Sequence, residues 1–192
     1  MPLPFRIGFG WDLHRFEAGR PLRLGGIEVP HPRGLSGHSD ADVACHALGN
    51  ALLGAAGQGD LGAHFPDSDP KWKGVTGAGI LSEVRAIVAR AGWIPSQFSV
   101  FLIAQAPRLA PHREAMRRAM AEALGMDPSC ANVAFATPEG VGALGRQEAI
   151  AAHAVAVLEP SAQWPASREA GSVEPGGSGG RSHGGREPPR SI

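Results

Sequence analysis

The sequence has few cysteines, no excess of charge of either sign and no long hydrophobic run. Cys45 and Cys130 lack metal or redox spacing such as Cys-x-x-Cys and are weak grounds for a disulfide framework, so we expect reduced core thiols. The 18 basic and 18 acidic residues are interspersed, which gives no indication of a nucleic-acid surface. No apolar stretch approaches a membrane span, and the N-terminus lacks the basic-then-apolar layout of a signal peptide. We therefore expect a cytoplasmic protein with neither a nucleic-acid nor a membrane partner.

Composition divides the chain near residue 159. Residues 1–159 are enough for one ordinary domain and too few for two. Residues 160–192 are rich in glycine, serine, proline and arginine. Because such a segment cannot bury enough apolar surface to offset the entropy of ordering it, we expect a disordered tail.

Within the domain, hydrophobic periodicity predicts alternating strands and helices. A strand is expected around Gly8 to Leu13, and helices over residues 43–56, 80–91 and 111–124, the last stopped by Gly125. Residues 98–104 and 133–136 are typical of strands. The run 150–158 stays ambiguous, because its alanines favour a helix whereas buried strands are also apolar throughout.

The most informative pattern is Asp12-Leu13-His14 together with His46. In an extended segment, residues two apart point to one face, so Asp12 and His14 can approach the same metal ion. We expect Ser39-x-x-Asp42 to cap the following helix, with His46 aimed from that helix toward the strand and Asp42 on the same helical face. One carboxylate and two imidazoles form the ligand set of an open zinc site, which favours an enzyme.

Each of these residues also has an ordinary structural interpretation. A single helical histidine among apolar neighbours is more often a satisfied, partly buried side chain, and Asp12 is compatible with a turn. The convergence of several ligand types from two short segments favours the metal site. A generic zinc hydrolase is less favoured, because no further motif supplies a clear water-activating base.

Four separated motifs resemble the 2-C-methyl-D-erythritol 2,4-cyclodiphosphate synthase family over residues 5–158. They are residues 6–14 (RIGFGWDLH), residues 37–62, residues 65–70 (FPDSDP), and residues 104–107 (AQAP) with Pro111-His112. The resemblance implies an α+β fold with a mixed sheet layered against helices in a ferredoxin-like arrangement. It also implies a homotrimer with active sites at the subunit interfaces.

The activity implied by the resemblance is a cyclisation in the non-mevalonate isoprenoid pathway. The 2-phosphate of 4-diphosphocytidyl-2-C-methyl-D-erythritol 2-phosphate attacks the β-phosphorus, and CMP leaves. Because nucleophile and leaving group belong to one molecule, the protein mainly aligns the substrate and neutralises phosphate charge.

The resemblance also assigns roles to residues. Asp12, His14 and His46 would hold zinc, and Glu139 would help hold magnesium or manganese. His38 and Thr137 would be catalytic, and Arg146 would meet an isoprenoid diphosphate in a central cavity of the trimer. The positions implied to bind substrate are His38, Ser39, Asp60, Gly62, Asp67, Lys73, Ala104, Pro107, Arg108, Leu109, Thr137, Glu139 and Arg146.

Several of these positions have alternatives, and some depart from the family pattern. Gly57-x-Gly59, which precedes Asp60, more often marks a helix end than a phosphate loop, and Glu139 after Pro138 is compatible with a first helical turn. The family usually has aspartate at Asn50, and threonines followed by lysine around residues 136–140. A second hypothesis is therefore a catalytically weak or inactive relative that binds zinc and a nucleotide or an isoprenoid diphosphate.

Overall fold

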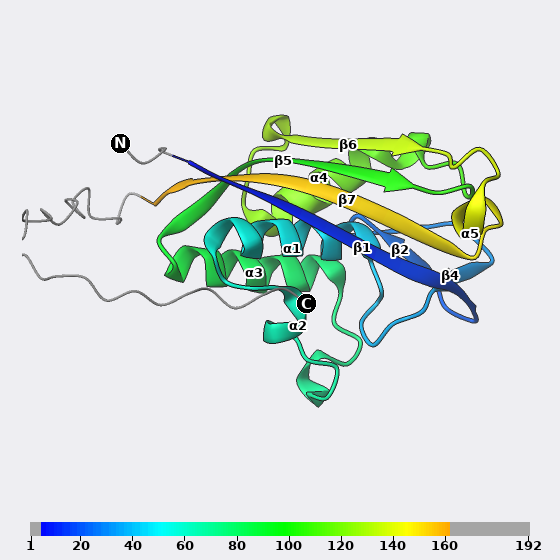
Figure 1. The fold of residues 1–192 in the computed structure, drawn as a ribbon, viewed down its shortest axis with the longest axis horizontal. Helices are drawn as coiled ribbons and strands as arrows, with labels where there is room; N and C mark the ends of the chain where they lie inside the picture. The colour runs from blue at the N-terminus through cyan, green and yellow to red at the C-terminus, as the bar shows by residue number, and fades with distance from the viewer. Residues whose placement is uncertain (1–4, 162–192) are drawn as a thin grey trace, which may run out of the picture.

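A mixed five-stranded sheet forms one layer of the protein and helices form the other (Figure 1). The structure is a computed structural model, and it describes residues 5–161. Strands β5 and β6 are parallel, and the other neighbouring strands are antiparallel. In spatial order the strands are β4 (Arg33–Leu35), β1 (Arg6–Ala18), β7 (Ala149–Pro160), β5 (Trp93–Ile103) and β6 (Ala131–Ala136).

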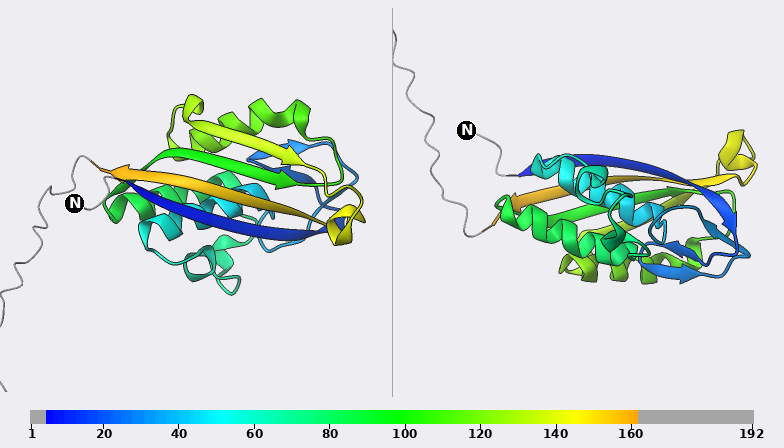
Figure 2. Two further views of the ribbon diagram at one scale, coloured as in Figure 1. Left: turned by 45° about the horizontal axis from the view of Figure 1, so that its top comes forward. Right: turned by 90° about the horizontal axis from the view of Figure 1, so that it is seen from below.

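Helices cover a single face of this sheet (Figure 2). Helix α1 (Val43–Ala56) lies against β1 and β7, α3 (Gly77–Arg90) packs beside α1, and α4 (Arg113–Leu124) packs against α3 and β6. None of the helices within residues 5–161 has the length and hydropathy needed to cross a membrane. The short elements are β2 (Leu22–Leu24), β3 (Ile27–Val29), α2 (Leu61–His64), α5 (Gly142–Gly145) and the 3-10 turns η1 (Pro70–Trp72), η2 (Ala110–His112) and η3 (Pro128–Cys130).

The layered α+β architecture is confirmed, but the ferredoxin-like connectivity is wrong. That arrangement runs β-α-β-β-α-β. Here the four long strands follow the order β1, β5, β6, β7 with helices in the first two connections, and β7 returns between β1 and β5. The difference arises because α4 links β5 to its parallel neighbour β6, a crossover that hydrophobic periodicity does not reveal.

The ambiguous run 150–158 belongs to strand β7, and the helix over 43–56 is confirmed. In β7, alanines at alternate positions face α1, so their small size serves close packing of sheet and helix rather than helix propensity. Strand β7 extends through Pro160. Ser161 N–H also donates to the Gly92 carbonyl, and the rest of the tail expected over residues 160–192 lies outside the described residues.

Strand β1 has an unusual distribution of side chains. Its large apolar residues Ile7, Phe9 and Trp11 point to the open face and are 50–64% exposed, whereas Gly8 and Gly10 face α1. A Cβ atom built on Gly10 would lie only 2.0 Å from the Ala47 carbonyl oxygen. The glycines therefore let the backbones of β1 and α1 approach closely, and this approach sets how near Asp12 and His14 of β1 come to His46 of α1.

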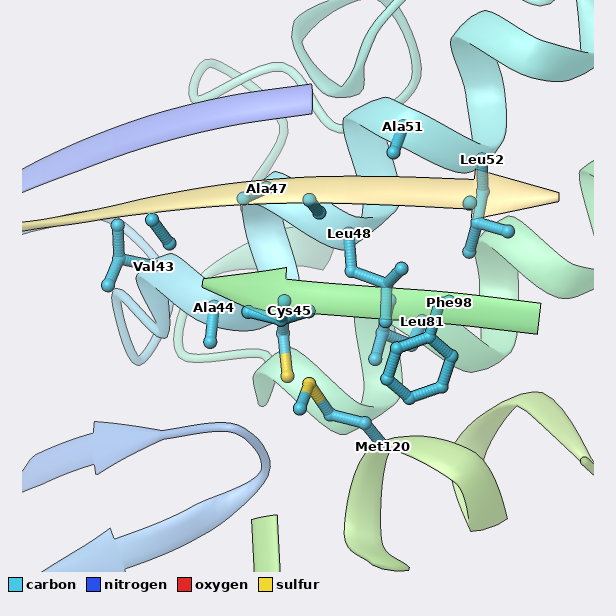
Figure 3. Packing of buried hydrophobic residues seen from close by; sticks show 14 of the residues in the cluster. Val43, Ala44, Cys45, Ala47, Leu48, Ala51, Leu52, Leu81, Phe98 and Met120 are labelled. Carbon is cyan, nitrogen blue, oxygen red and sulfur yellow. The ribbon is translucent and has the colours of Figure 1, made fainter. Parts of the chain in front are cut away.

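The core lies between the sheet and the helices (Figure 3). Leu48 and Leu52 of α1, Leu81 of α3, Phe98 of β5 and Met120 of α4 are almost completely buried there. Each such side chain contributes about 1.5–3 kcal/mol through removal of apolar surface from water. This shared core fixes α1, which carries His46, against the sheet whose strand β1 carries Asp12 and His14.

Candidate active site

Three side chains predicted to bind metal come together where β1 passes the first turn of α1. The Asp12 Oδ2 atom lies 3.0 Å from His14 Nε2 and 3.0 Å from His46 Nδ1, and the two imidazole nitrogens are 3.1 Å apart. Asp12 and His14 are two residues apart on β1, and both side chains lie on the side of the strand that faces α1, as this spacing predicted. We refer to these three residues as the metal triad.

The triangle of donor atoms suits a small divalent cation. Zinc bonds of about 2.0–2.1 Å in a tetrahedral arrangement place neighbouring ligands about 3.3 Å apart. The observed separations of 3.0–3.1 Å are close to this value. Asp12, His14 and His46 could therefore hold zinc with one ligand atom each.

Outer hydrogen bonds select the imidazole nitrogens that face this triangle. His14 Nδ1–H donates to the Ser36 carbonyl at 2.6 Å, and His46 Nε2 shares a hydrogen bond of 3.2 Å with Ser39 Oγ, to which it donates when the ring proton is on Nε2. With the ring protons on these outer nitrogens, the inner nitrogens turn lone pairs toward the Asp12 carboxylate, whereas a proton on an inner nitrogen lets that ring donate to Asp12. Such a cluster repels itself unless a proton or a cation lies between its members, so the donor set fits a bound metal.

The electrostatics of the triad agree with that conclusion. Burial raises the pKa of the Asp12 carboxyl, but hydrogen bonds and charge interactions with His14 and His46 outweigh burial and hold this pKa well below its usual range. Burial lowers the pKa of His14, yet its interactions with Asp12 and the Ser36 carbonyl raise the pKa overall. The Asp12 carboxylate therefore remains charged and favours a cation beside it.

The expected cap of α1 is wrong in detail. Asp42, not Ser39, is the N-cap residue, and its Oδ1 accepts hydrogen bonds from the backbone N–H groups of Ala44 and Cys45. The Asp42 carboxylate is fully buried and also accepts from Gly25 N and Gly26 N, so it does not share the pocket-facing side with His46. Sequence spacing could not reveal the Gly25-Gly26 turn as a competing partner.

Ser39 instead lies beside the metal triad. Its Oγ accepts from the Ala41 backbone N–H, and it also accepts from His46 Nε2–H in the tautomer that leaves His46 Nδ1 free to bind a metal. The hydroxyl proton of Ser39 is therefore available to a ligand. This arrangement supports a polar role for the His38–Ser39 loop.

A pocket of about 470 Å³ opens over the triad and this loop. It brings together the predicted site residues from Asp12 to Asp67. Asn50 also lines it, and the Asn50 Oδ1 accepts from Leu61 N at 3.0 Å, which ties α2 to α1. Of the predicted residues, the pocket is lined by Asp12, His14, His38, Ser39, His46, Asp60, Gly62 and Asp67.

Apolar walls of this pocket were missed by the sequence analysis. Phe65 and Trp72 pack edge to face with ring centroids 4.7 Å apart, and both line the pocket. The signal was present, since these aromatic residues flank the proline-bounded turn at residues 66–70. Asp60 has a structural role as well, because it caps α2 by accepting from Ala63 N. Gly57 ends α1 in the left-handed conformation, as its helix-end interpretation predicted.

The remaining predicted residues lie elsewhere on the chain. A second pocket, of about 380 Å³, is lined by Ala104, Pro107, Arg108, Leu109 and Thr137 at the carboxyl ends of β5 and β6. No lining residue is common to the two pockets. A single described chain therefore presents the two groups of residues separately.

Three predicted residues line neither pocket. Lys73 is exposed at the end of η1, next to the pocket residue Trp72. Glu139 accepts a hydrogen bond from the Thr137 hydroxyl and has a positive φ of 51°, so it is not in a helical first turn. Arg146 is exposed and pairs with Glu148 at 2.6 Å.

Comparisons with known proteins agree on one family. The model of the YgbB family matches residues 5–159. The 2-C-methyl-D-erythritol 2,4-cyclodiphosphate synthase of Dechloromonas aromatica (strain RCB) is 51% identical over 155 residues, covering 81% of this chain and 97% of that protein. The bifunctional enzyme IspD/IspF of Anaeromyxobacter dehalogenans (strain 2CP-C) is 52% identical over 155 residues, and the chain spans only 40% of its length.

The fold comparison gives the same result. A solved structure of 2C-methyl-D-erythritol-2,4-cyclodiphosphate synthase in its CDP-bound form aligns with a TM-score of 0.74 at 40% identity. The alignment covers 80% of this chain and 100% of that chain.

Proposed function

Since the chain belongs to the YgbB family, together with the 2-C-methyl-D-erythritol 2,4-cyclodiphosphate synthases, we propose that it catalyses their reaction. The substrate is 4-diphosphocytidyl-2-C-methyl-D-erythritol 2-phosphate. An oxygen of the 2-phosphate forms a bond to the β-phosphorus, the bond between that phosphorus and the CMP oxygen breaks, and the cyclic diphosphate and CMP are the products. The observation that carries the proposal is the metal triad at the base of a pocket with a polar loop beside it.

Asp12, His14 and His46 would hold zinc, which supplies charge neutralisation and polarisation at a phosphate oxygen when it is bound. The residues of the loop bind and orient. The Ser39 hydroxyl, whose oxygen already accepts two hydrogen bonds, donates its proton to a phosphate oxygen. His38, which lines the pocket above the triad, contacts the same phosphate.

The rest of the first pocket accommodates the methylerythritol. Asp60 and Asp67 offer carboxylates to its hydroxyl groups, with Gly62 leaving room beside them. Phe65 and Trp72 supply an apolar wall that excludes water. Because the substrate carries both nucleophile and leaving group, holding it in one bent conformation is the main contribution of these side chains.

The second pocket would hold the cytidine part. Ala104, Pro107, Arg108 and Leu109 form the wall against the base, and Thr137 contacts the diphosphate. Glu139, at hydrogen-bond distance from Thr137, would help bind magnesium or manganese, which prefer oxygen ligands. Lys73, which is exposed and follows the pocket residue Trp72 in the chain, would add a positive charge for the phosphates.

A homotrimer would bring the two pockets together across subunit interfaces. The open sheet face supports this proposal, because it exposes Phe9, Trp11, Phe101 and Val155, all between 41% and 64% exposed. Contiguous exposed apolar surface of this kind marks an interaction site. Within the assembly, Arg146 would be placed to meet an isoprenoid diphosphate in a central cavity.

The direct test is to incubate the purified, zinc-loaded protein with the substrate and magnesium or manganese. Mass spectrometry should detect CMP and the cyclic diphosphate. His46→Ala should abolish both products, and His31→Ala, which alters a histidine outside the triad, should not. A folded, zinc-loaded trimer that releases no CMP would contradict the proposal and favour the catalytically inactive binding protein.

A further inference from the structure

Arg20 makes contacts that the proposed mechanism does not use. It lies in the turn between β1 and β2, and two of its guanidinium nitrogens donate to the carbonyl oxygens of Gly37 and Ser39. These two carbonyls flank His38. The Arg20 side chain is 29% exposed, and its ion pair with the more exposed Glu17 is long, at 3.6 Å.

The Gly37 and Ser39 carbonyls depend on Arg20. Within residues 5–161 they accept no other hydrogen bond, whereas the His38 carbonyl accepts from Gly74 N. The backbone N–H groups of His38 and Ser39 donate to no acceptor in that part of the chain. The loop is therefore held through its carbonyls, and its N–H groups are left for a ligand.

We propose that Arg20 is a positioning residue that fixes the His38–Ser39 loop in the conformation that binds the substrate phosphate. This proposal rests on the proposed function and deepens it. The planar guanidinium can hold two carbonyls at once in fixed geometry, which a lysine ammonium does not reproduce. Its permanent charge also adds positive potential behind an anion-binding loop and polarises the peptide unit that carries the His38 N–H.

Position in the chain makes this role specific. Arg20 follows β1, the strand that supplies Asp12 and His14. His14 holds the same loop from its other end, through the Ser36 carbonyl. The metal triad and the phosphate loop are therefore connected through one segment of about ten residues, in which Arg20 acts on the loop without touching the substrate.

The test compares Arg20→Met and Arg20→Lys with Arg23→Met. Arg23 is a matched control, because in the part of the chain that the structure describes it pairs only with Glu28 of the β2–β3 hairpin, at 2.9 Å. With zinc-loaded enzyme, Arg20→Met should raise KM for the substrate by about tenfold to a hundredfold, as expected for losing charge-assisted hydrogen bonds. Arg20→Lys should recover only part of this loss, added methylguanidine should partly rescue Arg20→Met, and Arg23→Met should match the wild type.

Hydrogen exchange measured by mass spectrometry separates the two proposals. Exchange at residues 36–41 should be faster in Arg20→Met than in Arg23→Met, whether or not the protein turns over substrate. If the wild type releases no CMP, the proposed function fails, and the exchange result alone decides the role of Arg20. Unchanged KM together with unchanged exchange in Arg20→Met would overturn the positioning role. If Arg20→Met fails to fold, the same two readouts on Arg20→Lys decide it.

Discussion

Replacing Gly10 by alanine should disable the metal triad from a position that is not a ligand. The added Cβ would lie 2.0 Å from the Ala47 carbonyl oxygen and 2.5 Å from Ala51 N. Both atoms belong to the α1 backbone, so no side-chain rotation can relieve the overlap. Because ordinary contacts begin at 3.4 Å, α1 must move away from β1 by about 1.4 Å.

That displacement acts directly on the metal site, because His46 precedes Ala47 on α1 whereas Asp12 and His14 lie on β1. Metal sites tolerate deviations of about 0.2 Å in their ligand distances. We therefore expect Gly10→Ala to weaken zinc binding at least about a hundredfold. Overpacking should also lower the free energy of unfolding of the zinc-free protein by about 1–3 kcal/mol.

The assays are competition for zinc with a chromophoric chelator and urea unfolding of the metal-free protein. Gly54→Ala is the matched control, since Gly54 is also in α1 and a Cβ there meets nothing within 4 Å. This control should leave zinc affinity unchanged and raise the free energy of unfolding by about 0.5–1 kcal/mol, because alanine is the better helix former. Wild-type zinc affinity in Gly10→Ala would refute the reasoning that close backbone approach builds the site.

Four further results are expected. Asp42→Ala should lower the free energy of unfolding in urea by at least about 3 kcal/mol, because several buried N–H groups lose their acceptor. Phe98→Ala should lower the free energy of unfolding by about 3–5 kcal/mol in the same assay, because it leaves a cavity in the core. Phe101→Ala, on the open face of the sheet, should chiefly weaken self-association, measured by sedimentation velocity. Asn50→Asp should keep the acceptor that ties α2 to α1 and change kcat/KM for CMP release by less than about tenfold; a larger gain would show that the natural chain is impaired. Zinc affinity in the chelator assay should fall as the pH drops through the raised pKa of His14, since protons and metal compete for the same nitrogen; affinity independent of pH would contradict this.

The family pattern also suggests Gly140→Lys, to be combined with Asn50→Asp. The backbone conformation at residue 140 makes this substitution unfavourable. Gly140 has a φ of +74°, a conformation that favours glycine, and a side chain there costs about 1–2 kcal/mol. Glycine, rather than the lysine of the family pattern, therefore suits the local turn, in which Glu139 also has a positive φ. Any gain from a lysine would have to exceed that strain.

The metal triad could be predicted from sequence because its ligands follow local geometry. Two-residue spacing on a strand places Asp12 and His14 on one face, and helix α1 begins and ends where the pattern indicated. Resemblance added the expected substrate-binding positions, and most of them line one of two pockets, whereas Lys73, Glu139 and Arg146 line neither.

What sequence could not supply depends on partners distant in the chain. Asp42 replaced Ser39 as the cap because the Gly25-Gly26 turn provides two more N–H groups for its carboxylate. Arg20 was invisible as a functional residue, since nothing local shows that its guanidinium reaches the carbonyls of Gly37 and Ser39. The sheet order likewise follows from how β7 inserts between β1 and β5, which no local pattern encodes.

The different side chains on the two faces of β1 also disfavour pairing of β1 with β7 in a shifted register. If β1 slipped by one residue against β7, where Trp11 now pairs with His153, every side chain would change face. Trp11 and Phe9 would be driven into α1, which tolerates no side chain at Gly8 or Gly10, and the metal ligands would point away from His46. The strand thus specifies its own register by steric exclusion on one side and ligand geometry on the other. A single-residue insertion within β1 should be far more damaging than one in the turn at Gly19.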